Sequence, residues 1–178
     1  MKKQKHILIC GRRQVGKTTM VTRLMRELTV PVYGFQTVKA ATDPDGTHHI
    51  CMYPAGLVDG HISPENHIGD CNMHVLSLQP RVFDELGVSL LRTARPGGVI
   101  VMDELGFMEA KSEPFCGEVL KVLDGDIPVL ATVKDTDRGA MFLDRVRQHP
   151  NAELYMLTRE NYDEVLSEVL PKVRSWNC

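Results

Sequence analysis

Short apolar runs alternate along the chain with longer segments in which apolar residues recur at helical spacing. The apolar runs are rich in β-branched side chains, are bounded by turn-forming or charged residues, and do not alternate cleanly with polar residues. This pattern is typical of strands that are covered on both faces. Four such runs are Ile7–Cys10, Val99–Met102, Ile127–Val133 and Leu154–Leu157, and the less purely apolar Val32–Val38 is a fifth candidate.

Five segments between these runs each carry one apolar face, which predicts amphipathic helices. The apolar positions are Met20, Leu24, Met25 and Leu28; Phe83, Leu86, Leu90, Leu91 and Ala94; Phe115, Cys116, Val119, Leu120 and Leu123; Met141, Phe142 and Val146; and Tyr162, Val165, Leu166, Val169, Leu170 and Val173. Strands that alternate with helices predict an α/β fold with a parallel sheet covered on both faces. At roughly 150 residues per domain, residues 1–178 are expected to form a single domain.

The segment 32–79 interrupts this alternation. Asp43-Pro44-Asp45-Gly46 predicts a turn, and we interpret Val32–Thr42 and Thr47–Tyr53 as the two strands of a β-hairpin. Ala55–Gln79 is rich in Gly, Asp, His and Asn, and we interpret it as an irregular insertion or flap. A long loop in a compact domain is usually functional or mobile.

Composition and charge narrow the classes of function. The chain is 43% hydrophobic and 25% charged with a net charge of −2, which fits a folded domain and argues against a nucleic-acid partner that needs a broad basic surface. Nothing approaches an apolar run of about 18 residues, so we expect no membrane span. The run Ile7–Cys10 is too short for a signal peptide, and the five cysteines form no close pair. We therefore expect a cytoplasmic protein, and favour a monomer while leaving the oligomeric state open.

One motif indicates the class of function more strongly than any other feature of the sequence. Gly11–Thr18 reads Gly-Arg-Arg-Gln-Val-Gly-Lys-Thr and fits the phosphate-binding pattern GxxxxGK[ST] at every constrained position. It follows an apolar run and precedes an amphipathic segment, the context that a phosphate-binding loop requires. Lys17 would then reach the β- and γ-phosphates, and Thr18 would bind Mg²⁺. The expected nucleotide-binding residues of the loop are Gly11, Arg12, Arg13, Gln14, Val15, Gly16, Lys17, Thr18 and Thr19. The weaker alternative is a glycine-bounded turn before a helix.

A second motif ends the apolar run Val99–Met102 in two carboxylates, Asp103 and Glu104. Asp103 would hold Mg²⁺ and accept a hydrogen bond from Thr18, and Glu104 would act as the general base on a water near the γ-phosphate. The pattern alone also fits a strand that ends at the protein surface. The phosphate-binding loop upstream favours the catalytic interpretation.

The stretch Asp103-Glu104-Leu105-Gly106-Phe107-Met108-Glu109 resembles the Asp-Glu-Ile-Gly-Lys-Met-Glu signature of the nucleoside-triphosphatase family first described from thermophiles, which includes a human cancer-related nucleoside-triphosphatase. Gly34-Phe35-x-Thr37 resembles the hairpin strand of that family, and Thr158-x-Glu160-Asn161 resembles a segment before its last helix. The resemblance spans about residues 5–170. It implies Mg²⁺-dependent hydrolysis of nucleoside triphosphates such as ATP or GTP, with broad base tolerance. It also implies a three-layer, RecA-like core with one strand between the loop strand and the Asp103 strand.

The chain departs from the family pattern at several positions. Arg13-Gln14 stand where Pro-Gly is frequent, Val38-Lys39 follow the hairpin threonine, Phe107 replaces a usual lysine and Tyr162 replaces a usual arginine. The loss of two cations bears on the efficiency of hydrolysis, because electrostatic stabilisation dominates phosphoryl transfer. Arg12 and Arg13 either restore positive charge or are solvated loop residues.

The segment after Ile127–Val133 offers weaker candidates. Arg138 would act as a catalytic cation on the phosphates or cap the following helix, since the carboxyl ends of parallel strands face the nucleotide. Thr132 or Lys134 could sense the γ-phosphate from the same edge. Two acidic residues, Asp135 and Asp137, are expected to cap the helix that begins near Arg138.

The loop after the last strand carries Arg159 and Asn161. Asn161 would contact the base, because its amide offers both a donor and an acceptor; the alternative is the N-cap of the last helix. We expect Met102, Met108, Met141 and Met156 in the core, and Trp176 and Cys178 in a frayed tail.

Five of the seven histidines fall between His48 and His74. The spacing His67-x3-Cys71-x2-His74 presents metal-ligand types, with His61 or Asp70 as a fourth ligand. We favour the alternative that these are polar residues of the flap.

Two other functions compete with hydrolysis. A kinase that phosphorylates a nucleotide or small metabolite usually needs an arginine-rich lid, and Ala55–Gln79 contains no arginine, although Arg92 and Arg95 could serve an acceptor. A non-hydrolysing regulatory module is the third alternative, which Phe107 and Tyr162 keep open. A chain of 178 residues has little room for a substrate domain, which favours water as the acceptor.

Overall fold

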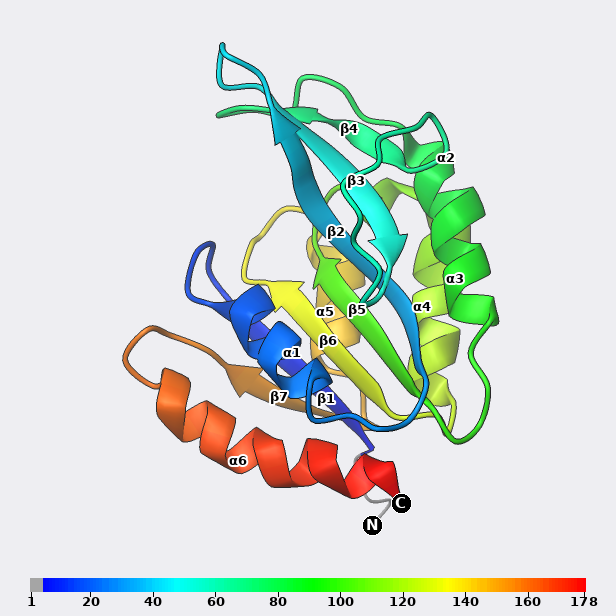
Figure 1. Ribbon diagram of the computed structural model, residues 1–178, viewed down its shortest axis with the longest axis vertical. Helices are drawn as coiled ribbons and strands as arrows, with labels where there is room; N and C mark the ends of the chain where they lie inside the picture. The colour runs from blue at the N-terminus through cyan, green and yellow to red at the C-terminus, as the bar shows by residue number, and fades with distance from the viewer. Residues whose placement is uncertain (1–4) are drawn as a thin grey trace.

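The computed structural model describes residues 5–178, which form a seven-stranded sheet with helices packed on both faces (Figure 1). The strands are β1 His6–Gly11, β2 Val32–Thr42, β3 His48–Pro54, β4 His67–Cys71, β5 Val99–Leu105, β6 Val129–Lys134 and β7 Ala152–Met156. The helices are α1 Lys17–Met25, α2 Pro80–Val82, α3 Val88–Arg92, α4 Glu113–Asp124, α5 Ala140–Arg147 and α6 Tyr162–Arg174. A π-helical turn, Phe83–Gly87, joins α2 to α3, and 3₁₀ turns lie at Glu109–Lys111 and Ser175–Asn177.

The strands follow the order β4-β3-β2-β5-β6-β1-β7. Strands β2, β5, β6, β1 and β7 run parallel, whereas β3 pairs antiparallel with both β2 and β4. Strand β6 therefore lies between β1 and β5, as the family resemblance implied. The predicted α/β fold class is confirmed, and so is the hairpin, which corresponds to β2 and β3.

Two apolar layers explain why the central strands do not alternate in sequence. In β1, Leu8 packs into the layer under α3, α4 and α5, and Ile9 packs into the layer under α1 and α6. Both side chains are fully buried. Each such side chain contributes about 1.5–3 kcal/mol by leaving water, so both faces of the strand select apolar residues.

The expectation of an irregular flap is wrong at one place. Strand β4 lies within it and pairs with β3 through Ile50↔Gly69 and His49↔Asp70. Its five residues are too few and too polar to show a strand period. The open edge of β3, rather than the sequence of β4, therefore supplies the pairing.

Strand β7 is an edge strand, because it pairs with β1 alone. Its Leu154 and Met156 are 37% and 50% exposed, and Met141 at the start of α5 is 86% exposed. The placement of Met141 and Met156 in the core is therefore wrong. Met102 is buried, and Met108 packs against the core.

The C-terminal residues through Asn177 pack against the rest of the protein, so the expectation of a frayed tail is wrong for Trp176. The side chain of Asn177 accepts a hydrogen bond from Thr29 N and donates one to Glu27 O, both at 2.8 Å, and Trp176 packs against the α1–α6 layer. The expected caps of α5 are also wrong, because Gly139 occupies the N-cap position and no side chain caps the helix. Throughout residues 5–178, helices are too short or too polar to cross a bilayer.

Candidate active site

Two glycines shape the loop between β1 and α1. Gly16 has φ of 102°, and a Cβ atom added there would lie 3.2 Å from the ring of Tyr162. A Cβ on Gly11 would lie 2.6 Å from the carbonyl oxygen of Leu157. The loop is thus packed against the start of α6, and Tyr162, the residue that replaces a usual arginine, forms part of its floor.

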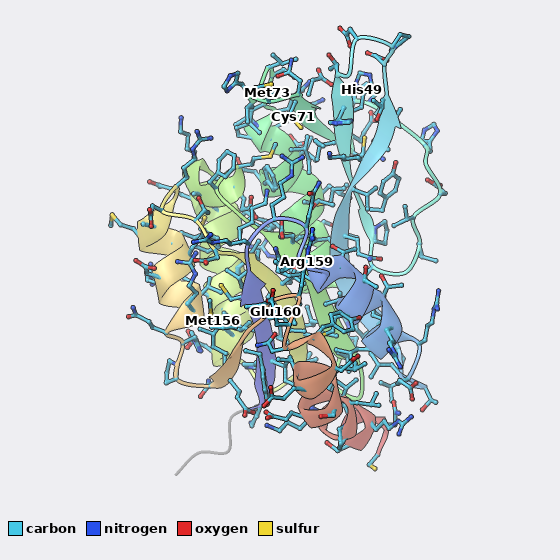
Figure 2. All side chains as sticks on the ribbon, turned by 90° about the vertical axis from the view of Figure 1, so that its left-hand side faces the viewer. His49, Cys71, Met73, Met156, Arg159 and Glu160 are labelled. Carbon is cyan, nitrogen blue, oxygen red and sulfur yellow. The ribbon has the colours of Figure 1, made fainter. Side chains whose placement is uncertain are left out.

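Gln14, at the tip of this loop, has φ of 62°, a left-handed conformation that glycine adopts at least cost. Its carbonyl oxygen accepts hydrogen bonds from Arg159 Nε and Nη2 at 3.4 and 3.3 Å. Figure 2 shows Arg159 and Glu160 on the loop that joins β7 to α6. Arg159 therefore holds that loop against the loop of Gln14.

Lys17, at the start of α1, is buried with only 5% exposure. Its ammonium donates to the carbonyl oxygens of Gly11 and Arg12, both at 2.8 Å, and lies 3.1 Å from Glu104 Oε2. These contacts occupy the three donor positions of a lysine ammonium. The side chain is thereby aimed along the loop toward the carboxyl end of β5.

Asp103 is 1% exposed at the end of β5. Its Oδ1 accepts hydrogen bonds from Thr132 at 2.6 Å and from Thr18 at 3.2 Å. Its Oδ2 is buried and accepts no hydrogen bond from residues 5–178. Burial raises the pKa of Asp103, and the two hydroxyl donors oppose that effect. A buried carboxylate oxygen without a partner, beside a threonine hydroxyl, fits a bound cation.

Glu104 lies between two lysines. Its Oε2 is 3.1 Å from Lys17 Nζ, and its Oε1 is 3.3 Å from Lys134 Nζ at the end of β6. The peptide bond between Asp103 and Glu104 is cis. The Glu104 backbone N–H donates to Thr37 Oγ1 at 3.3 Å, so the hairpin threonine fixes the backbone at the carboxylate.

A small cavity of about 280 Å³, the inner cavity, opens above the loop. It is lined by Arg13, Gln14, Gly16, Lys17, Thr18, Thr19, Glu104 and Lys134. The expected loop residues Gly16, Lys17 and Thr18 thus meet Glu104 in one space. Thr132 lines neither this cavity nor the larger one described below. Its hydroxyl instead donates a hydrogen bond to Asp103.

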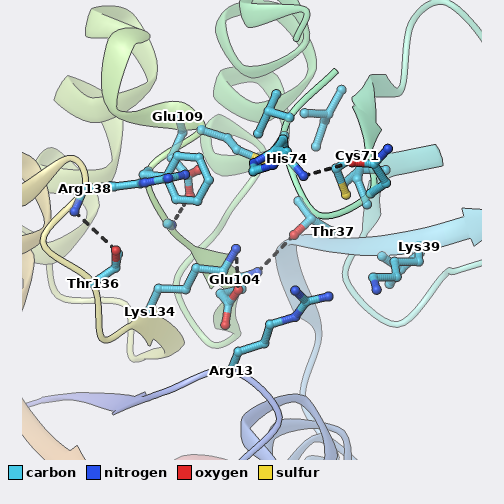
Figure 3. Close-up of a pocket in the computed structure, with 18 of the residues that line it drawn as sticks. Arg13, Thr37, Lys39, Cys71, His74, Glu104, Glu109, Lys134, Thr136 and Arg138 are labelled. Carbon is cyan, nitrogen blue, oxygen red and sulfur yellow. Dashed lines mark hydrogen bonds and ion pairs between the residues drawn. The ribbon is translucent and has the colours of Figure 1, made fainter. Parts of the chain in front are cut away.

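A larger cavity of about 480 Å³, the outer cavity, continues from the inner one toward β3 and β4. The two cavities share Arg13, Glu104 and Lys134. Figure 3 shows these three side chains on one side of the outer cavity and Cys71 and His74 on another. Arg138 also lines the outer cavity, and it does not reach the inner one.

Phe107 gathers two cations at the outer cavity. Lys134 Nζ lies 5.3 Å from the centroid of its ring, and the guanidinium carbon of Arg138 lies 5.2 Å from the same centroid. Both distances are within the range of cation–π attraction. The aromatic ring therefore retains positive charge at the position where the family usually has a lysine.

Glu109 is 3% exposed, and its Oε1 accepts a hydrogen bond from Gly106 N at 2.5 Å. Burial raises the pKa of Glu109 to about 7, against the opposing effect of that hydrogen bond. Its carboxyl thus supports the turn after Glu104.

Asn161 occupies the N-cap position of α6, but its side chain makes no capping bond. Its Oδ1 accepts from Thr158 N, and its Nδ2 donates to Met156 O, each at 2.8 Å. One donor and one acceptor of the amide are not used in these bonds. The side chain is oriented by its own loop, and contact with a base stays a prediction.

Sequence comparison agrees with this geometry. A profile of a family described as NTPase matches residues 6–170. The chain belongs to this NTPase family. It is 30% identical to nucleoside-triphosphatase THEP1 of Methanocaldococcus jannaschii, over 94% of this chain and 96% of that protein. It is 27% identical to the cancer-related nucleoside-triphosphatase homolog of Bos taurus, over 96% and 97% of the two chains.

Two solved structures share the fold of this chain. The crystal structure of THEP1 from Aquifex aeolicus superposes with a TM-score of 0.70 at 24% identity, over 94% of this chain and 98% of that chain. The solution structure of a human cancer-related nucleoside triphosphatase gives 0.64 at 23% identity, over 96% and 98%. The family resemblance inferred from Asp103–Glu109 is confirmed.

Proposed function

We propose that this chain hydrolyses nucleoside triphosphates, ATP or GTP among them, to the diphosphate and phosphate. One observation carries the proposal: the Glu104 carboxylate is held between Lys17 and Lys134 at the wall of the inner cavity, beside the Thr18–Asp103 hydrogen bond. A carboxylate placed between two cations at the end of a phosphate-binding loop can orient water against a phosphoryl group. The relatives named as nucleoside-triphosphatases support the same chemistry.

The polyphosphate would occupy the inner cavity. The backbone N–H groups of the loop and the N-terminus of α1 favour an anion there. Lys17 is already turned toward this space and would exchange its Glu104 contact for the β- and γ-phosphates. Lys134 and Arg13 line both cavities, and their charge would offset the charge that develops on the transferring group.

Asp103 and Thr18 would hold Mg²⁺. The buried Oδ2 of Asp103, which has no partner among the described residues, is the observation that fits the ion. When bound, Mg²⁺ neutralises negative charge on the phosphate oxygens. Thr132 keeps the Asp103 carboxylate in place by donating to its Oδ1.

Glu104 would take a proton from the attacking water, and such a base typically contributes 10²–10⁴-fold to a rate. Thr37 fixes its backbone and Lys134 fixes its carboxylate. We also propose that the chain tolerates different bases and that Asn161 contacts the base. A cytoplasmic location is a separate proposal, which the five free thiols support.

The test is release of phosphate from each of the four common nucleoside triphosphates with Mg²⁺ and no other acceptor. Glu104→Gln should reduce release by at least about 100-fold and leave nucleotide binding intact. Glu113→Gln, a matched change on an exposed residue that lines neither cavity, should leave release unchanged. Full activity in Glu104→Gln would refute the base, and release that requires an added acceptor would refute hydrolysis.

The outer cavity favours a second candidate, phosphoryl transfer to a small acceptor. Its volume of about 480 Å³ suits a small molecule, and it meets the inner cavity at Glu104 and Lys134. An acceptor hydroxyl there would replace water, with Glu104 taking its proton. Val75→Trp would fill the outer cavity alone, because Val75 does not line the inner one. If the wild type transfers phosphate to a small acceptor, and Val75→Trp loses this transfer but still hydrolyses nucleotides, the second activity is established.

A further inference from the structure

Three metal-ligating side chains converge where β3 and β4 pair. His49 Nδ1 lies 2.6 Å from Asp70 Oδ1, and His67 Nε2 lies 2.9 Å from the same oxygen. The three ligand atoms all lie within 4.8 Å of one another. Figure 2 shows His49 at the end of the molecule formed by the hairpin, far from Arg159. None of the three residues lines the outer or the inner cavity.

The remaining polar atoms of two of these side chains are held by neighbours. His49 Nε2 lies 3.0 Å from Asp43 Oδ2, and Asp70 Oδ2 accepts a hydrogen bond from Ser77 Oγ at 2.8 Å. A carboxylate behind a histidine ligand fixes the ring and is a regular feature of metal sites in proteins. His49 and Asp70 are thus oriented with one atom each toward the common centre.

We propose that His49, His67 and Asp70 bind one Zn²⁺ ion, with Asp43 orienting His49 from outside. Two imidazole nitrogens and one carboxylate oxygen suit zinc, whereas Mg²⁺ prefers oxygen ligands alone. Zinc–ligand distances of about 2.1 Å place neighbouring ligand atoms about 3.4 Å apart in a tetrahedron. Asp70 Oδ1 would therefore withdraw by less than about 1 Å, which a partly exposed side chain allows. The fourth position is open to water.

This ligand set differs from the one that the sequence spacing suggested. Asp70 and Cys71 are adjacent in β4, so their side chains point to opposite faces of the sheet. Cys71 and His74 accordingly line the outer cavity, away from His49 and His67. The register His49↔Asp70 pairs two of the zinc ligands, and the irregularity between Ile50↔Gly69 and Cys51↔His67 brings His67 onto the same face.

The zinc site would stiffen one wall of the outer cavity. The backbone of Asp70 bonds to Leu76 N at 2.8 Å, and to Ser77 through both a backbone and a side-chain contact. The segment 71–76 between these anchors begins with the last residue of β4 and carries Cys71, Met73 and Val75, which line that cavity. Zinc bound to Asp70 would thus fix both ends of this segment. This effect does not depend on whether the chain hydrolyses nucleotides.

The full-length protein is freed of metal with a chelator and dialysed against Zn²⁺ in excess Mg²⁺, and bound zinc is counted by elemental analysis. We expect one equivalent for the wild type, and affinity lowered by more than about 100-fold in His67→Gln and Asp70→Asn. Asp43→Asn should weaken binding by about 10-fold, the lower end of the usual effect of an outer partner. Cys71→Ser and His74→Gln, the matched controls, should bind as the wild type does.

Two measurements keep the proposal falsifiable if a ligand variant fails to fold. Co²⁺ bound to the wild type should give d–d bands and no thiolate-to-metal charge-transfer band. Zn²⁺ should also slow proteolytic cleavage within residues 72–76 in the wild type. A thiolate band, absence of saturable zinc in the wild type, or equal loss of binding in Cys71→Ser and His67→Gln would overturn the proposal.

Discussion

Arg138 lies over the ring of Phe107, with its guanidinium carbon 5.2 Å from the centroid of the ring, and Lys134 Nζ lies 5.3 Å from the same centroid. Lys134 also pairs with Glu104 at 3.3 Å. Phe107 stands where the family usually has a lysine. Its aromatic side chain carries no charge of its own, but it positions the two cations Lys134 and Arg138. The chain therefore keeps positive charge beside the Glu104 carboxylate.

Replacement of Phe107 by Leu should remove this positioning and keep apolar volume. Each exposed cation–π contact is worth about 0.5–1 kcal/mol, so we expect kcat/KM for phosphate release to fall by about 2- to 5-fold for each cation that loses its position. Phe107→Tyr retains a ring face and should keep the wild-type rate. Equal rates in Phe107→Leu and the wild type would show that the ring does not position the cations.

The left-handed conformation of Gln14 predicts an asymmetric response to substitution. Gln14→Gly should leave the free energy of unfolding unchanged or higher by up to about 1 kcal/mol, because glycine adopts φ of 62° without a Cβ penalty. Gln14→Val should lower it by about 1–2 kcal/mol, since a β-branched residue is strained there. Arg159 contacts the backbone oxygen of Gln14, so this contact does not depend on the side chain at position 14. Chemical denaturation measures both changes, and a stable valine variant would contradict the prediction.

The sequence predicted the parts of the site that consecutive residues carry. The residue types of Gly11–Thr18 and Asp103-Glu104 indicate phosphate binding and metal or base chemistry. The two motifs lie close together because parallel strands end at the same edge of the sheet. The contacts that complete the site depend on pairing between distant strands. Thr132 reaches Asp103 only because β6 lies beside β5, with Met102 opposite Ala131.

The zinc ligands show the same limit more sharply. The spacing from His67 to His74 identified a histidine-rich flap, but local spacing could not reveal that β4 forms or that Asp70 lies opposite His49. A one-residue change of register would exchange Asp70 for Cys71 on that face. The irregularity in the pairing of β3 with β4, together with strand alternation, therefore separated Cys71 from His67, which the linear pattern had grouped.

Glu109 predicts a pH dependence of stability. Its pKa rises from 4.5 to about 7 on folding, so the folded state binds an additional proton between these values. Its contribution to stability is fully present below pH 4.5 and is lost as the pH rises through about 7, a change of about 3 kcal/mol. Glu109→Gln keeps an acceptor for Gly106 N and should remove this dependence. Denaturation of both proteins from pH 5 to 8 measures the difference, and parallel stability curves would refute it.

Asp103→Asn separates metal binding from folding. The amide oxygen can still accept from Thr132 and Thr18, while the buried charge at the partnerless Oδ2 is removed. Because an unpaired buried charge opposes folding, stability in chelator should equal or exceed that of the wild type. The Mg²⁺ concentration for half-maximal phosphate release should rise by about 10-fold or more, since one ligand loses its charge. Asp135→Asn, a matched change in the outer cavity, should alter neither quantity. An unchanged Mg²⁺ requirement in Asp103→Asn would remove Asp103 from the metal site.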